Sequence, residues 1–181
     1  NSDAEYQFKV QSDDKIYFWV ADESVASCYI GRVSPTVTAY ENKWIHVVGT
    51  YDGGTASTGL KIYINGEQVD DATAESNAGS FVAMEQLGAD VYIGKYNTIY
   101  ANGAITEVSM WNTELTQAQI NELYNNGKAL DATTHSASPS TGTDYLKGYW
   151  RNNGLATWQD LTANNRDGSP TSLTETMLIT A

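Results

Sequence analysis

The chain has 181 residues, of which 41% are hydrophobic, and it includes 12 Tyr and 5 Trp. This size and composition predict a globular domain with a real core and exclude a disordered chain. The formal net charge of −12, with no basic stripe, excludes nucleic-acid binding, and no apolar run approaches the roughly 20 residues that would insert into a membrane.

The first 40 residues contain short apolar segments that are separated by polar turn residues. Alternation of apolar and polar side chains predicts a strand at 6–10, and the apolar run at 16–21 predicts its hairpin partner. A third strand is expected at 27–33 and a short one at 37–40. Turn signals about every ten residues are typical of a β-sandwich.

The middle of the chain carries the strongest strand signals. Both faces of residues 44–48 are apolar, which predicts a strand buried on two sides in the middle of a sandwich. Residues 60–64 alternate and end at Asn65-Gly66, a pair that favours the positive φ angles of a type I′ turn. We therefore expect the chain to return as a strand at 67–69.

Further strands are expected at 91–94, 105–111 and 145–150, and the apolar residues 177–179 are typical of a last strand. Residues 70–80 are small and polar and indicate a loop.

One helix is expected, near 117–126. Thr116 is a candidate N-cap, and Gln119 three residues later completes a capping box. Ile120 belongs to the apolar stripe of this helix, and Gly127 is suited to the left-handed position after its end.

An aromatic and amide-rich loop is the candidate carbohydrate site. It contains Tyr96, Asn97, Tyr100 and Asn102, and aromatic faces can stack on sugar rings while amides bond the hydroxyl groups. The alternative interpretation is an ordinary loop with two half-buried tyrosines.

Four blocks of the sequence resemble a known family. They are WIHVVGTYDG, LKIYING, VYIG and GAITEVSMWNTELTQAQINELYNNG, and together they make residues 6–127 similar to the laminin G-like domain of the concanavalin A-like lectin/glucanase superfamily. The resemblance implies an all-β fold, an antiparallel jelly-roll sandwich with one short helix near 117–126. It says less about function, because the superfamily holds lectins, adhesion modules, accessory domains and glucanases.

The resemblance also implies a domain organisation. Residues 1–128 correspond to the sandwich without the family's opening strands, and residues 129–144 form a Ser/Thr-rich linker. Residues 145–181 contain GYWRNNGLATWQDLTANNRDGSP, which resembles the opening of such a domain. This segment either packs on the sandwich or begins a second domain. In both cases we expect an open sheet edge that a neighbouring chain or a second copy covers.

Calcium is implied by the resemblance only, because laminin G-like domains often hold one Ca²⁺ at the rim of the sandwich. The Ile-Asp-Glu motif of the family has Thr106 in place of its aspartate here. The candidate ligands are Asp22, Asp52 and Glu107, and Ca²⁺ requires six to eight oxygen atoms. The alternatives are a solvated acidic surface and, for Asp52, a role in capping the following turn.

Catalysis is not expected. Catalytic members of the superfamily carry Glu-x-Asp-x-x-Glu on one strand, and this spacing is absent from the sequence. Glu107 lies in a predicted strand without a second carboxylate two residues away, whereas glycoside hydrolysis requires a pair. His46 and His135 do not form a convincing triad with any nucleophile motif.

The sequence therefore predicts a non-catalytic, lectin-like recognition module for carbohydrate. The blocks are similar to those of large phage and marine microbial surface proteins, which implies an extracellular or virion surface. The alternative is a structural or adhesion module of a phage or cell-surface assembly that binds protein partners. A glycan-degrading enzyme is the least favoured hypothesis.

Overall fold

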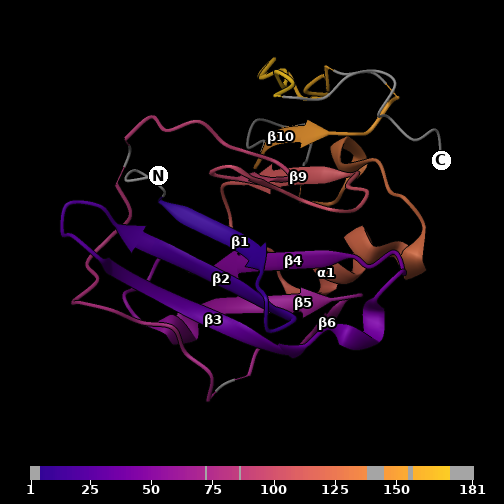
Figure 1. Ribbon diagram of the computed structural model, residues 1–181. Coiled ribbons are helices and arrows are strands. Elements are labelled where there is room, and N and C mark those ends of the chain that lie inside the picture. The colour runs from indigo at the N-terminus through magenta and orange to yellow at the C-terminus, as the bar shows by residue number, and fades with distance from the viewer. Residues whose placement is uncertain (1–4, 72, 86, 138–144, 155–156, 172–181) are drawn as a thin grey trace. The chain divides into compact units, whose positions relative to one another are not determined.

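The computed structural model describes residues 5–71, 73–85, 87–137, 145–154 and 157–171. The chain divides into two compact units, Asn1–Ile93 and Gly94–Ala181, and each unit is described by itself. The described residues are mostly β-structure with one short α-helix, as expected (Figure 1). None of the described helices has the length and apolar character that crossing a bilayer requires.

The first sheet of the Asn1–Ile93 unit has the order β1-β2-β3 and is antiparallel (Figure 1). Its strands are β1 (Tyr6–Val10), β2 (Lys15–Asp22) and β3 (Cys28–Thr36). The predicted β1–β2 hairpin is confirmed, because Tyr6 pairs with Val20 and Val10 pairs with Ile16.

The second sheet of this unit has the order β4-β5-β6. Its strands are β4 (Val47–Tyr51), β5 (Leu60–Ile64) and β6 (Glu67–Gln68), with the 3₁₀ helix η2 (Ser57–Gly59) between the first two. Asn65 and Gly66 have φ angles of 52° and 86°, which confirms the predicted type I′ turn.

One apolar cluster holds this unit together, and strands of both sheets contribute to it. From Lys15 to Val20 of β2 every second residue is buried, because successive side chains of a strand point to opposite faces. The buried members are Ile16, Phe18, Val20, Cys28, Ile30, Leu60, Ile62, Ile64 and Phe81. Cys28 is thus a small buried hydrophobic residue.

The prediction of a strand buried on both faces at residues 44–48 is wrong. Trp44 is 64% exposed and Val47 is 38% exposed, and the strand begins only at Val47. Trp44 precedes the strand, and β4 itself lies at the end of its sheet and pairs only with β5 in the described structure. Residues 38–40 form the 3₁₀ helix η1 (Thr38–Tyr40) instead of the expected strand.

The described residues of the Gly94–Ala181 unit form two two-stranded sheets. One is the hairpin of β7 (Lys95–Tyr96) and β8 (Ile99–Tyr100), and the other pairs β9 (Val108–Trp111) with β10 (Leu146–Trp150). The expected strand at 145–150 is therefore confirmed, and it runs antiparallel to β9 with Trp150 opposite Val108.

Two predicted strands differ from the structure. Residues 91–94 form no strand, and Gly94, with a φ of 72°, leads into the β7–β8 hairpin. The strand expected at 105–111 is only β9, because Glu107 has a φ of 55° immediately before it.

The helix α1 (Gln117–Tyr124) begins as predicted. The Thr116 hydroxyl accepts a hydrogen bond from the Gln119 amide, and the Gln119 side chain accepts from the Thr116 amide. The helix ends at Asn125 in the left-handed conformation, and Gly127, at a φ of 77°, closes the 3₁₀ turn η3 (Asn125–Gly127) that follows.

The region expected as a linker is ordered where the structure describes it. After the 3₁₀ helix η4 (Ala132–Thr134), the side chains of His135 and Ala137 are buried. Residues 138–144, and the strand expected at 177–179, lie outside the described residues.

Candidate functional site

The four predicted carbohydrate-binding residues lie in or next to the β7–β8 hairpin. Asn97 occupies the turn with a φ of 53°, and the amide of Ala101 extends the pairing by donating to the Gly94 carbonyl at 2.8 Å. Asn97 and Asn102 are exposed, as are Tyr96 and Tyr100 at 40% and 50%. The amino acids singled out from composition are thus gathered on one small ribbon.

The hairpin register divides these residues between two faces. Tyr100 is opposite Lys95, and Tyr96 is opposite Ile99. Residues opposite each other point to the same face of a ribbon and neighbours point to opposite faces, so Tyr96 and Tyr100 face away from one another. One sugar ring therefore cannot stack on both tyrosines.

The two faces differ in chemistry. The Lys95 ammonium group lies 5.8 Å from the centre of the Tyr100 ring, which combines an aromatic surface with a hydrogen-bond donor. On the other face Tyr96 is beside Ile99, which is 68% exposed and has no group that can bond a sugar hydroxyl.

Asp22, a candidate metal ligand at the end of β2, is only 2% exposed. Its carboxylate accepts hydrogen bonds from the Ser24 hydroxyl and amide and from the Val82 amide. The Ser24 hydroxyl bond is the largest of the contributions that hold the pKa of Asp22 below its usual value. This side chain fixes the turn after β2.

Asp52, the second candidate ligand, caps a turn as the alternative interpretation proposed. Its Oδ1 accepts a hydrogen bond from the Gly54 amide at 2.7 Å. A Cβ atom at Gly59 would lie only 2.1 Å from the same oxygen, so Gly59 leaves the space that this carboxylate occupies.

Glu107, the third candidate ligand, forms an ion pair with Arg151, which was not among the predicted site residues. Arg151 Nε donates to Glu107 Oε1 at 2.7 Å and Arg151 Nη2 donates to Oε2 at 3.2 Å. The Tyr149 hydroxyl also donates to Glu107 Oε2, and it accepts from Arg151 Nη2 at 2.7 Å. Both carboxylate oxygens are therefore engaged within the protein.

The three candidate calcium ligands are engaged within the protein. The carboxylates of Asp22, Asp52 and Glu107 each accept hydrogen bonds from neighbouring residues, and Ca²⁺ requires six to eight oxygen ligands. Within the described ranges no group of three or more His, Cys, Asp or Glu side chains could hold a metal ion.

Tyr149 has an unusual titration because of its place in this network. The side chain is 1% exposed, and burial, followed by the hydrogen bond to Glu107 and its negative charge, raises the pKa of Tyr149 to about 12. The cation of Arg151 opposes this shift without cancelling it.

We expect the stability of the Gly94–Ala181 unit to fall between pH 10 and pH 12. In this range the unfolded chain loses the Tyr149 proton and the folded chain keeps it, so the free energy of unfolding falls by on the order of 2 kcal/mol. Urea unfolding at several alkaline pH values measures the loss. Tyr149→Phe should remove most of the pH dependence, and an unchanged slope in this variant would contradict the assignment.

Asp160 organises the turn after β10 and was also missed by the sequence analysis. It is 6% exposed and accepts from the amides of Tyr149, Thr162 and Arg166 at 3.1, 3.0 and 2.9 Å, and from the Thr162 hydroxyl at 2.9 Å. Asp167 in turn accepts from the Asp160 amide. The sequence does contain a signal for this turn, because Asp160-Leu161-Thr162 has the spacing of an Asx turn.

The two histidines are packed and do not form a catalytic arrangement. His135 is 1% exposed; its Nδ1 accepts from the Ala137 amide, so its Nε2 donates to the Gln119 carbonyl at 2.8 Å. His46 lies just before β4, and burial lowers the pKa of its imidazole. His135 thus ties residues 132–137 to α1.

A comparison with protein families agrees with this architecture. A family model of laminin G type, described as the concanavalin A-like lectin/glucanases superfamily, matches residues 1–121. No curated protein and no solved structure matches the chain. Because the matched segment covers well over half of the 181 residues, the chain belongs to the laminin G-like family of the concanavalin A-like lectin/glucanases superfamily.

Proposed function

We propose that this protein is a non-catalytic carbohydrate-recognition module of an extracellular or virion surface protein, with a jelly-roll sandwich as its architecture. Membership of the superfamily favours a lectin-like or adhesion module. The observation that carries the carbohydrate proposal is the exposed hairpin face on which Tyr100 lies beside Lys95.

The Tyr100 face provides the two kinds of contact that a sugar requires. The half-exposed ring offers a flat apolar surface for the C–H face of a pyranose, and the Lys95 ammonium group can donate to hydroxyl oxygens beside it. The acidic protein would repel acidic polysaccharides, so a neutral glycan is the expected ligand.

Tyr100→Ala should weaken glycan binding roughly tenfold, because it removes the stacking surface. Tyr96→Ala should weaken it less than about threefold, since Tyr96 lies on the opposite face. A glycan array identifies the ligand, and calorimetry with that ligand gives the affinities.

The control is Tyr145→Ala, which removes another exposed tyrosine, 38% accessible, from the same unit. EDTA should leave the affinity unchanged, because the candidate calcium ligands are engaged by protein donors. Equal affinities of the Tyr100→Ala variant and the parent protein would remove the hairpin from the proposal.

We propose that the protein is not a glycoside hydrolase, because Glu107 is not suited to act as the catalytic acid. Glycoside hydrolysis needs one free carboxylic acid and a second carboxylate at a defined distance. Glu107 is paired with Arg151 and bonded by Tyr149, so it supports β9 and β10 and is not available as an acid.

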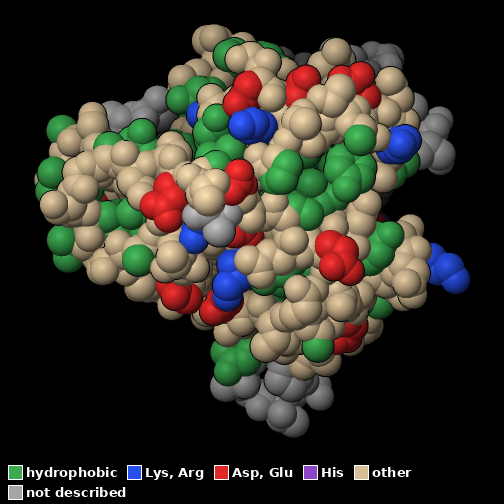
Figure 2. All heavy atoms as spheres, turned by 90° about the horizontal axis from the view of Figure 1, so that it is seen from below, with side chains coloured by type: hydrophobic (Ala, Val, Ile, Leu, Met, Phe, Trp, Pro, Cys, Tyr) green, Lys and Arg blue, Asp and Glu red, His purple; other side chains and the backbone are tan. Residues whose placement is uncertain are grey.

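A structural or adhesion role with protein partners is the second candidate function, and β1 favours it. This strand is at the edge of its sheet in the described structure. Its Tyr6, Phe8 and Val10 lie opposite the buried Val20, Phe18 and Ile16 of β2, so they extend the apolar face of the sheet to its edge, where they remain 36%, 39% and 62% exposed. Exposed apolar edge strands pair readily with other chains. Acidic side chains are spread over the face seen in Figure 2, which limits non-specific association.

If a second copy covers β1, the protein should self-associate and Val10→Lys should shift it towards the monomer. A charge at this 62% exposed position hardly disturbs the fold but opposes an apolar contact. Sedimentation velocity over a concentration series measures the change. A protein that stays monomeric at every concentration would exclude self-association through β1, and only a different protein could then cover this edge.

A further inference from the structure

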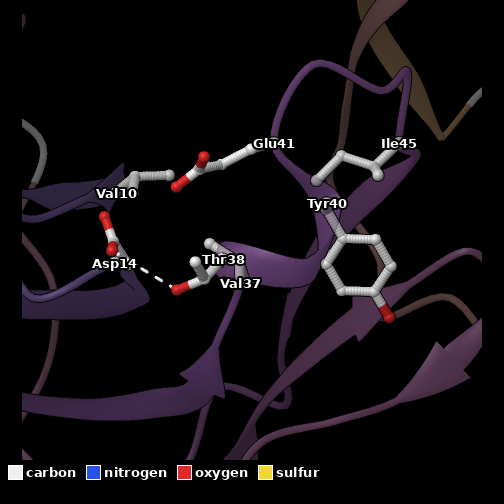
Figure 3. Close-up of a pocket in the computed structure, with 7 residues that line it drawn as sticks. All are labelled: Val10, Asp14, Val37, Thr38, Tyr40, Glu41 and Ile45. Atoms are coloured by element: carbon white, nitrogen blue, oxygen red, sulfur yellow. Dashed lines mark hydrogen bonds between the residues drawn. The ribbon is translucent and has the colours of Figure 1, made fainter.

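The Asn1–Ile93 unit contains a shallow pocket that the proposed carbohydrate site does not use (Figure 3). Its volume is about 180 Å³, below the roughly 300–1,000 Å³ of typical small-molecule sites, so it has room for one small group. The lining residues come from the end of β1, the β1–β2 turn, η1 and the segment before β4: Val10, Asp14, Val37, Thr38, Tyr40, Glu41 and Ile45.

The walls of the pocket are mainly aliphatic and are fixed in place. Val37, Tyr40 and Ile45 are partly buried and pack against the apolar cluster of the unit. Val10 completes the wall and is 62% exposed. A straight apolar chain could lie along these side chains, and the burial of its apolar surface would favour binding.

Two carboxylates lie at the pocket. Figure 3 shows the side chains of Asp14 and Glu41 near Val10, opposite Tyr40 and Ile45. Asp14 Oδ2 accepts one hydrogen bond, from the Thr38 hydroxyl at 3.3 Å. The Glu41 carboxylate has no hydrogen bond or ion pair with any residue that the structure describes, and no Lys, Arg or His lines the pocket.

We propose that this pocket binds the lysine side chain of a basic segment in a protein partner. The four methylenes of the lysine would contact Val10, Val37 and Ile45, and the ammonium group would lie between the carboxylates of Asp14 and Glu41. Because the protein carries a net charge of −12, its field would attract such a segment.

Other occupants fit less well. Two carboxylates and one hydroxyl supply too few ligands for a bound Ca²⁺. A sugar ring stacks on aromatic faces, whereas Tyr40 is the one aromatic residue of the lining. This inference is independent of the proposed glycan site, which lies in the other unit.

The first experiment titrates the ¹⁵N-labelled protein with n-butylammonium, which has the lysine stem and ammonium group. The amide resonances of Val10, Thr38 and Glu41 should shift and saturate, and n-butanol should not shift them. A lysine-containing peptide should bind more tightly than its Nε-acetylated form, because acetylation removes the positive charge.

Two variants test whether the carboxylates of Glu41 and Asp14 bind the ammonium group. Glu41→Gln and Asp14→Asn should each weaken butylammonium binding roughly two- to fivefold, and the double variant roughly tenfold. Both should fold, because Glu41 is exposed and asparagine tolerates the φ of 55° at position 14. Glu67→Gln is the matched control, since it removes one exposed negative charge from β6, outside the pocket.

Three outcomes would overturn the proposal: no shift with butylammonium, equal binding of the acetylated peptide, or equal affinities of the Glu41→Gln and Glu67→Gln variants. Larger shifts with glucosamine than with butylammonium would assign the pocket to an amino sugar instead of a lysine. The Tyr100→Ala substitution should not change butylammonium binding. The glycan proposal and the lysine proposal can therefore be contradicted independently of each other.

Discussion

Asp160→Ala should lower the free energy of unfolding of the Gly94–Ala181 unit by about 4 kcal/mol. The substitution leaves three amides and one hydroxyl without their acceptor, so the loss is at the upper end of what breaking a buried hydrogen-bond network by one substitution costs. Asp160→Asn should lose about half as much, because its remaining amide oxygen still accepts from Tyr149 and Thr162.

The pH dependence of this contribution follows from the direction of the pKa shift. Burial alone raises the pKa of Asp160, and the bonds donated by Arg166, Thr162 and Tyr149 more than reverse this effect, so the pKa is lowered. The folded state then holds its carboxylate ionised where the unfolded chain is protonated. The stabilisation is present above about pH 4 and is lost as the pH falls further.

Urea unfolding followed by tryptophan fluorescence measures these losses, with Glu114→Ala as a control that removes one negative charge from the same unit. Amide hydrogen exchange should accelerate at Tyr149, Thr162 and Arg166 in the Asp160 variants. A loss below about 1 kcal/mol would mean that water replaces this carboxylate as the acceptor.

Glu107→Ala should cost the same unit about 3 kcal/mol. Arg151 loses both of its bonds to Glu107, and the buried Tyr149 hydroxyl keeps only the more distant Leu130 carbonyl, at 3.3 Å, as an acceptor. The left-handed backbone at residue 107 is equally strained for Glu and Ala, so the change reports the side chain alone.

Glu107→Gln distinguishes a structural role from the metal-ligand hypothesis. Glutamine keeps one acceptor and loses the charge, so it should cost about 2 kcal/mol, and Arg151→Lys should cost a similar amount because lysine cannot make the forked contact. Thermal melting of each variant with and without Ca²⁺ completes the test. Variants as stable as the parent protein, together with a calcium-dependent rise in its melting temperature, would restore Glu107 as a ligand.

Local features of this fold could be predicted from the sequence because their physical causes lie within a few residues. The Asn65-Gly66 turn requires only two residues that accept positive φ, and the capping box requires Thr116 and Gln119 three positions apart. The β1–β2 hairpin follows in the same way from alternation on both sides of a polar turn.

Features that depend on neighbours distant in the chain were not predicted. Apolar residues on both faces of 44–48 indicate burial only if other parts of the protein cover both faces, and Trp44, which precedes β4, is 64% exposed. Positive φ at Glu107 likewise ends, before Val108, the strand that the apolar pattern predicted from residue 105.

The candidate site was predicted in composition but not in geometry. The aromatic loop could be identified from its residue types, whereas the separation of Tyr96 from Tyr100 depends on the register of a two-residue hairpin. For Glu107 the partner that decides its role is Arg151, 44 positions later, and a single sequence does not indicate such a pairing.

The pairing of β10 with β9 affects how the protein can be divided for experiments and how it emerges from the ribosome. The family match ends at residue 121, and a chain truncated there would retain β9 without its neighbouring strand and Glu107 without Arg151. Such a fragment should precipitate when it is expressed alone. During synthesis the same edge stays open until Leu146–Trp150 has been translated, so β9 of a newly made chain can pair with other chains at this stage.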